Sequence, residues 1–196
     1  EIENSLKKIL PQFIKNSNFV GEETFAKQPQ ILDFYNHEEH CWTVDPIDGT
    51  LNFVKGKEHF AIMIALTFKS KIIQSWIYKP LTQELMYSIS NKGTFLNQKK
   101  ITVNKFSSIS KSIGAISPKY WDKNIETKIK IIKNYFKKID SYGSIGCEYF
   151  DIALGKRDFA LLSRLSPWDH LPGISIIREA GGYDSHFDNM PYIFNK

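Results

Sequence analysis

Short apolar runs separated by polar breaks dominate the middle of the chain. The runs occupy residues 60–68, 72–79, 84–89, 95–96 and 101–103. Runs of this length between turn residues are typical of strands that pair with their sequence neighbours. The pattern therefore predicts an antiparallel meander whose aromatic side chains belong to the core.

Apolar residues recur at helical spacing outside the meander. Four helices are predicted from this spacing and from their end signals. They are the face Ile2, Leu6, Ile9, Leu10 and Phe13, broken at Pro11; the face Ile125, Ile129, Ile132 and Phe136 behind Asp122; residues 144–154 before Gly155; and residues 166–180. Further short strands are expected at 19–20, 113–117 and 158–162, whereas 25–41 reads as a polar, irregular, exposed connection.

Composition places the chain among ordinary globular proteins. It has 196 residues, of which 42% are hydrophobic and 24% charged, so we expect a substantial core rather than disorder. Two lobes forming one catalytic unit are predicted, at 1–106 and 107–196. The net charge of +5 comes from scattered lysines, which favour a solvated surface, so a nucleic-acid partner is the less favoured alternative.

The two cysteines and the hydropathy of the chain indicate its cellular compartment. Cys41 and Cys147 lie far apart without a disulfide pattern, which favours a reducing compartment. The longest apolar run, Phe60 to Leu66, is far shorter than the roughly 20 residues that span a bilayer, and no signal peptide is recognised before it. We therefore expect a cytoplasmic protein without a membrane partner.

Residues 42–53 contain the candidate metal-binding and catalytic residues. An apolar run ends there in two carboxylates, Asp45 and Asp48. Trp42 to Val44 favour a strand, and Pro46 predicts a turn directly after Asp45. Gly49 would let neighbouring N–H groups surround an oxyanion. A cation such as Mg²⁺ must then separate the phosphate from the carboxylates. A local Asx-turn is the alternative.

Three other metal or phosphatase sites fail on spacing. Asp48-Gly49-Thr50-Leu51 is similar to the nucleophile motif of haloacid-dehalogenase-type phosphatases, but that motif needs an Asp where this chain has Pro46. An EF-hand loop likewise fails, since its third position, which must supply a ligand, would be Ile47. His37-Glu38-Glu39-His40-Cys41 lacks recognised metal-ligand spacing.

Four segments together carry a family resemblance. They are Trp42 to Phe53; Gly21-Glu22-Glu23-Thr24; Pro167-Trp168-Asp169; and Glu179-Ala180-Gly181-Gly182. In order and spacing they resemble the signatures of the inositol monophosphatase family of Mg²⁺-dependent, lithium-sensitive phosphatases, across nearly the whole chain. The resemblance implies an α/β (α+β) fold, a layered αβαβα sandwich, and a homodimer.

The resemblance also implies a site with two or more Mg²⁺ ions. The implied metal ligands are Glu22, Asp45, the carbonyl of Ile47, Asp48 and Asp169, and the catalytic residues are Glu22, Asp45 and Thr50. The implied substrate contacts are Ile47, Asp48, Gly49, Thr50, Gly143, Ser144, Ile145 and Asp169. Helix capping explains Ser144 equally well, and helix-dipole stabilisation is the alternative for Asp169.

Several positions depart from the family. Leu162 replaces a Glu that binds sugar hydroxyls, which makes inositol phosphate a less favoured substrate, and Pro172 is expected to kink its helix. The chain starts at Glu1 and ends at Lys196, so we expect a portion of a longer product, without the family's preceding helices and the Asp that orients the Thr matched by Thr50.

The sequence thus predicts an Mg²⁺-dependent phosphomonoesterase that acts on a small sugar, inositol or related polyol phosphate. Two alternatives stay open. One is a 3′-nucleotide or histidinol phosphatase. The other is a catalytically weak module that binds RNA or a transcription complex.

Overall fold

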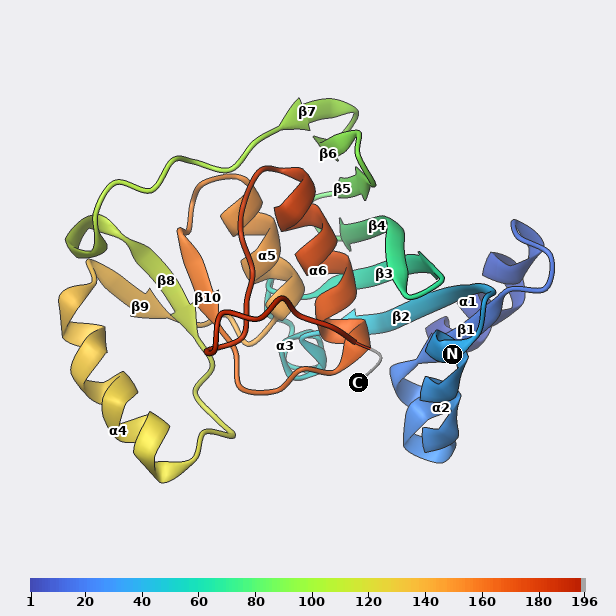
Figure 1. The fold of residues 1–196 in the computed structure, drawn as a ribbon, viewed down its shortest axis with the longest axis horizontal. Helices are drawn as coiled ribbons and strands as arrows, with labels where there is room; N and C mark the ends of the chain where they lie inside the picture. Colours follow the sequence, from blue (N-terminus) through green and yellow to red (C-terminus); the bar gives the residue numbers. More distant parts are fainter. Residues whose placement is uncertain (195–196) are drawn as a thin grey trace.

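Two β-sheets of unequal size form the framework of the protein, whose computed structural model describes residues 1–194 (Figure 1). The large sheet has the strand order β1-β2-β3-β4-β5-β6-β7. Its strands are β1 (Asn18–Gly21), β2 (His40–Asp48), β3 (Ala61–Phe68), β4 (Lys71–Lys79), β5 (Glu84–Ile89), β6 (Gly93–Leu96) and β7 (Lys99–Ile101). Only the β1–β2 pair is parallel, which confirms the predicted meander.

The small sheet is entirely parallel, in the order β10-β8-β9. It consists of β8 (Ile113–Ile116), β9 (Lys138–Asp140) and β10 (Phe159–Leu161). Parallel neighbours need a crossover connection, and helices supply it here. The chain passes from β8 to β9 through α4 (Lys123–Ile132), whose N-cap Asp122 accepts hydrogen bonds from two backbone N–H groups.

Helices α5 (Ile145–Ala153) and α6 (Pro167–Glu179) lie between the two sheets (Figure 1). They bury Phe150 and Ile176 against Met63 and Ile77 of the large sheet. Helix α1 (Ile2–Ile9) packs near β2, where Leu10 and Trp42 share an apolar cluster. The remaining helices are α2 (Glu22–Lys27) and α3 (Thr50–Val54), with 3₁₀ turns at Leu10–Gln12, Pro29–Asn36, Ile109–Lys111 and Lys133–Tyr135. The mixed, layered α/β fold class is confirmed.

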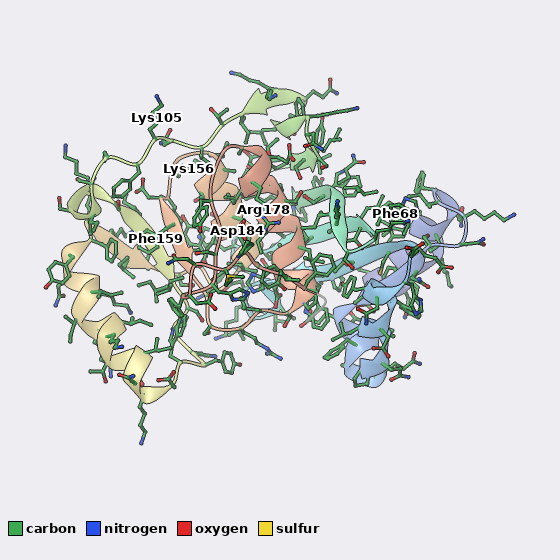
Figure 2. The ribbon with its side chains drawn as sticks, viewed as in Figure 1. Phe68, Lys105, Lys156, Phe159, Arg178 and Asp184 are labelled. Carbon is green, nitrogen blue, oxygen red and sulfur yellow. The ribbon has the colours of Figure 1, made fainter. Side chains whose placement is uncertain are left out.

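The end of α6 is fastened to the segment that follows it. Arg178 and Asp184, labelled in Figure 2, form a bidentate ion pair with distances of 2.5 Å and 2.8 Å. Two parallel N–H to carboxylate bonds fix the geometry of such a pair. Within residues 1–194, no helix is long and apolar enough to cross a membrane.

The face that α1 and the turn after it present to the core agrees only in part with the one that the sequence predicts, since Leu6 and Leu10 belong to it. Ile9 is 48% exposed and Phe13 is 74% exposed, whereas Glu3 is buried with only 1% of its surface exposed. The apolar periodicity misses this because the buried face carries a carboxylate, Glu3, which the pattern counts as polar. The buried stripe therefore runs through Glu3, Leu6 and Leu10.

The segment 25–41 also differs from the exposed, irregular connection that was expected. It contains the end of α2, the 3₁₀ helix Pro29–Asn36 and the start of β2. Ile31 and Tyr35 are buried against Val20 and Trp168, and the Tyr35 hydroxyl is 2.7 Å from the Thr43 hydroxyl. An aliphatic and an aromatic side chain four residues apart suffice to anchor a short helical segment.

Three buried serine hydroxyls join α6 to the large sheet. Ser75 donates to the carbonyl of Pro172 at 3.0 Å, Ser88 lies 2.7 Å from Ser75, and Ser175 lies 2.8 Å from Ser88. Because each hydroxyl has one proton, Ser175 donates to Ser88 and Ser88 donates to Ser75. The chain of bonds ends on the carbonyl of Pro172, where the backbone stays helical.

Replacing the middle serine tests this chain of bonds. Ser88→Ala leaves the buried Ser175 hydroxyl without its acceptor, so the free energy of unfolding should fall by about 1–3 kcal/mol. Urea unfolding measures the change. Ser110→Ala, at an exposed position, should leave stability unaltered, and an equal loss in both variants would contradict the assignment.

Candidate active site

Asp45 and Asp48 lie at the end of β2, where the strand bulges. Asp45 pairs with Met63 and Asp48 with Ala61, so β2 has an extra residue between them relative to β3. The turn predicted directly after Asp45 is therefore wrong, because β2 continues through Pro46. A proline is tolerated at a bulge, where the ladder does not need its missing N–H group.

Gly49 reverses the chain after β2 with φ +83°, a backbone conformation that favours glycine. A Cβ atom there would lie 2.8 Å from the carbonyl oxygen of His59. The next residue, Thr50, starts α3 and donates its hydroxyl proton to the carbonyl of Ile47 at 2.9 Å. Its oxygen keeps lone pairs for accepting another hydrogen bond, and the Ile47 carbonyl keeps a second acceptor site.

Asp169 reaches the end of β2 from the first turn of α6. Ser166 is the N-cap and Pro167 occupies the first helical position, as the sequence predicts. One carboxylate oxygen from each of Asp45, Asp48 and Asp169 can be chosen so that all lie within 4.8 Å of one another. None of the ion pairs found within residues 1–194 involves these three carboxylates. An all-oxygen donor set of this charge fits a hard divalent cation such as Mg²⁺.

The carboxylate of Asp48 is held by the start of α5. It accepts hydrogen bonds from the Ser144 hydroxyl at 2.5 Å and from the N–H groups of Ile145 and Gly146 at 3.1 Å and 2.7 Å. A Cβ atom at Gly146 would lie 3.0 Å from this carboxylate, so the main chain approaches it closely. Ser144 also accepts from the N–H of Cys147, and the helix-capping interpretation of Ser144 is thus correct.

The segment before α5 is tied to α3. The Asn52 side-chain amide donates to the carbonyls of His59 and Tyr142 at 2.7 Å and 2.8 Å. The rings of His59 and Tyr142 stack with centroids 4.0 Å apart. These contacts place Gly143, whose φ is +70°, beside the loop that carries Gly49.

Burial raises the pKa of all three clustered carboxyl groups. Loss of solvation is the largest cause for Asp45, followed by repulsion from Asp48. Burial likewise raises the pKa of Asp48, although its bonds to Ser144 and Gly146 oppose the shift. Burial also raises the pKa of Asp169, where the nearby positive charge of Arg164 acts in the opposite sense. A bound cation would reverse these shifts.

Glu22 does not belong to the three-carboxylate group. It is the first residue of α2 and is exposed. Burial of part of its side chain raises its pKa, and repulsion from Asp169 adds to the shift. The structure thus places Glu22 within electrostatic reach of Asp169 and Asp45.

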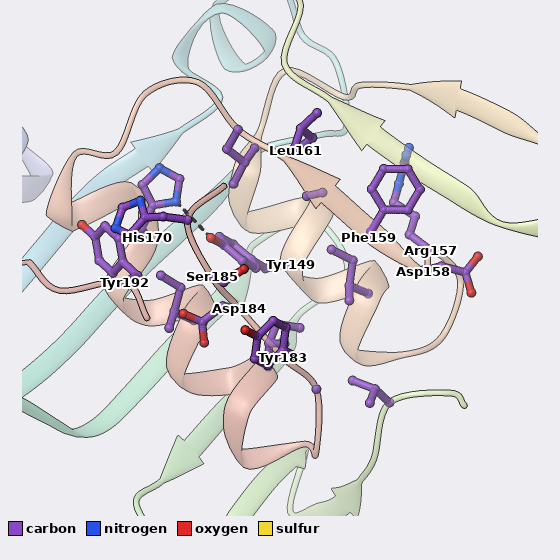
Figure 3. A pocket seen from close by; sticks show the side chains of 18 of the residues that line it. Tyr149, Arg157, Asp158, Phe159, Leu161, His170, Tyr183, Asp184, Ser185 and Tyr192 are labelled. Carbon is purple, nitrogen blue, oxygen red and sulfur yellow. Dashed lines mark hydrogen bonds between the residues drawn. The ribbon is translucent and has the colours of Figure 1, made fainter. Parts of the chain in front are cut away.

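A cavity of about 1270 Å³ lies between β10, α6 and the segment after α6 (Figure 3). Asp45, Asp48 and Asp169 are not among the residues that line it. Leu162 lines this cavity. His170 borders it, with one ring nitrogen 2.9 Å from the Tyr149 hydroxyl and the other 2.5 Å from the carbonyl of Arg164. The ring of His170 therefore fixes the loop that leads into α6 and Asp169.

Two residues beside the site were not identified from the sequence. Glu3 accepts hydrogen bonds from the chain just after Glu22, and Glu148 accepts from the Ser141 hydroxyl and the N–H of Tyr142 at 2.6 Å and 2.9 Å. The signal for Glu3 was available, since it shares a helix face with Leu6 and Leu10. Glu148 lies in an apolar helix, and its partners come from the loop before that helix, which no helical periodicity reveals.

Comparisons with known proteins find similar sequences over most of the chain. The model of the inositol monophosphatase family matches residues 1–195. Inositol-1-monophosphatase of Bacillus subtilis is 29% identical over 90% of this chain and 68% of its own length. Inositol monophosphatase 1 of Solanum lycopersicum is 34% identical over 88% of this chain and 64% of its own length.

A solved structure has a similar fold. The crystal structure of inositol monophosphatase-II from Staphylococcus aureus superposes with a TM-score of 0.86 at 26% identity, over 98% of this chain and 74% of that one. The chain spans about two thirds of the length of the curated relatives.

The raised pKa of Asp45 predicts a pH effect in the absence of metal. The folded chain then binds more protons than the unfolded chain at any pH between the unfolded and folded pKa values of Asp45, so stability falls as pH rises through this range. Asp45→Asn removes this contribution. In EDTA from pH 5 to pH 8, the wild type should lose stability relative to Asp45→Asn by up to about 1.4 kcal/mol per pH unit.

Urea unfolding at each pH measures this difference. Asp33→Asn, which alters an exposed carboxylate, should follow the wild type. Parallel curves for wild type and Asp45→Asn would refute the electrostatic account of the cluster.

Proposed function

The chain belongs to the inositol monophosphatase family, and we propose that it hydrolyses phosphate monoesters of small polyols or sugars with Mg²⁺. The observation that carries the proposal is the convergence of Asp45, Asp48 and Asp169, whose ligand atoms lie within 4.8 Å of one another. Because these residues come from β2 and α6, far apart in sequence, their meeting is a property of the fold.

The residues that would hold the metal follow from their placement. Asp45, Asp48 and Asp169 supply carboxylate oxygens, Glu22 supplies another from the start of α2, and the Ile47 carbonyl has a free acceptor site. When bound, Mg²⁺ ions in such a site neutralise phosphate oxygens, lower the pKa of a water molecule and stabilise the leaving alkoxide. The number of ions that we propose is two or more.

Thr50 is suited to orient the attacking water. Its hydroxyl proton is committed to the Ile47 carbonyl, so its oxygen can only accept a hydrogen bond from the water. A fixed acceptor of this kind aligns a lone pair of the water with the phosphorus atom. Glu22, whose charge acts on Asp45, is the candidate acceptor for the second water proton.

The backbone around Gly49 is proposed to bind the phosphate. The left-handed conformation at Gly49 turns the chain sharply between Asp48 and Thr50, a geometry that can direct successive N–H groups to one side. The start of α5, with Gly143, Ser144 and Ile145, forms the opposite wall. Since the Ser144 hydroxyl is committed to Asp48, we assign its role to holding that carboxylate.

Position 162 bears on which leaving group the site accepts. Leu162 offers no acceptor for sugar hydroxyl groups and lines the large cavity. A relative from Thermotoga maritima is named fructose-1,6-bisphosphatase/inositol-1-monophosphatase, a name that covers a sugar phosphate as well as an inositol phosphate. We therefore propose sugar and polyol phosphates ahead of inositol phosphate itself, and a cytoplasmic homodimer as the form of the protein.

Phosphate release with and without Mg²⁺ tests this function. A panel of sugar, inositol, histidinol and 3′-nucleotide phosphates should yield turnover of at least one ester that EDTA abolishes. Asp169→Asn should lower kcat/KM by at least about 100-fold. Mutation of a residue that only hydrogen-bonds to a metal ligand costs up to about 100-fold, and loss of a ligand itself should cost at least as much. Asp33→Asn is the matched control, and full activity in Asp169→Asn would contradict the assignment.

A further inference from the structure

Glu3 is a buried acidic residue that the proposed reaction does not use. It lies on α1 with 1% of its surface exposed. Its carboxylate accepts three hydrogen bonds: from the N–H of Glu23 at 2.7 Å, and from the N–H and hydroxyl of Thr24 at 2.8 Å and 2.6 Å. Hydrogen bonds to an ionised carboxylate are about twice as strong as those between neutral groups.

The bonds lie in the first turn of α2, immediately after Glu22. The residue before this turn is Gly21, which has no side chain and so cannot cap the helix itself. The carboxylate of Glu3 occupies the space beside Gly21, where a Cβ atom would lie 2.4 Å from the carboxyl carbon of Glu3. The side chain of Glu3, from α1, thus caps the first turn of α2 in place of a side chain at position 21.

Glu22 itself has little else to hold it in place. Its side chain is exposed, and within residues 1–194 no hydrogen bond or ion pair is found for its carboxylate. The direction in which Glu22 points is therefore set by the backbone of α2, and two N–H groups of that backbone are bound to Glu3. Glu3 faces these N–H groups rather than the cluster of Asp45, Asp48 and Asp169.

We propose that Glu3 is a positioning residue for Glu22: by binding the backbone of Glu23 and Thr24, it aims the Glu22 carboxylate at the metal site. The role rests on the proposed function, since it assumes that Glu22 binds the metal. The charge of Glu3 also adds to the negative potential near Glu22, which favours a cation there.

Calorimetric titration of Mg²⁺ into Glu3→Gln tests the proposal without relying on turnover. The Gln amide keeps one acceptor oxygen but turns an NH₂ group toward N–H donors, so at least one of the three bonds is lost. Affinity for Mg²⁺ should fall about 10- to 100-fold, the usual effect of removing a partner behind a metal ligand. Hydrogen exchange at the amides of Glu23 and Thr24 should accelerate.

Leu6→Ala is the matched control, because Leu6 lies on the same helix and packs against the Leu10 and Trp42 cluster. It should lower the stability of α1 against the sheet while leaving the bonds of Glu3 and the affinity for Mg²⁺ unchanged. If Leu6→Ala weakened Mg²⁺ binding as much as Glu3→Gln, general support of the fold would explain the effect and the proposal would be overturned.

Gly21→Ala gives an independent variant, including the case in which Glu3→Gln fails to fold. Its added methyl group would push the Glu3 carboxylate off the N–H groups, so it should reproduce the loss of Mg²⁺ affinity. Unchanged affinity in Gly21→Ala with accelerated exchange at Thr24 would overturn the role of Glu3. A wild-type chain that binds no Mg²⁺ would instead overturn the metal site on which the proposal depends.

Discussion

Mutual repulsion among buried carboxylates is the constraint on which the structure depends. Asp45, Asp48 and Asp169 lie closer together than their charges would allow in isolation, and burial makes the repulsion stronger. Such an arrangement persists only if the surrounding fold imposes it. Here the strand β2, its pairing with β3 and the packing of α6 against the sheet supply the necessary stability from elsewhere in the molecule.

Backbone N–H groups repeatedly compensate these negative charges. The first turn of α5 binds Asp48, and the first turn of α2 binds Glu3. Helix starts are suited to this because their N–H groups have no partners within the helix. These main-chain bonds orient the carboxylates of Asp48 and Glu3 and oppose part of the effect of burial on Asp48. None of the ion pairs found within residues 1–194 involves either carboxylate.

Much of the fold followed from the sequence, since the meander and α6 have clear apolar patterns and end signals. The motif in residues 42–53 also indicated Asp45 and Asp48 as candidate metal ligands. Passage of β2 through Pro46 could not be foreseen, because tolerance of a proline depends on the bulge opposite β3. The burial of Glu3 could have been inferred from the helix face that it shares with Leu6 and Leu10, but its hydrogen-bond partners could not, because they belong to another segment and apolar periodicity contains no information about them. The division into lobes at residue 106 stays a prediction.

The hydrogen bonds from the start of α5 to Asp48 affect how the substrate selectivity of such an enzyme can change. Two of the three bonds come from the main chain of Ile145 and Gly146, so they do not depend on the identity of the side chain at position 145. The wall that we propose there can exchange its side chains while Asp48 behind it stays fixed. New selectivity for the departing alcohol could then arise by single substitutions at that wall, with the ancestral chemistry preserved throughout.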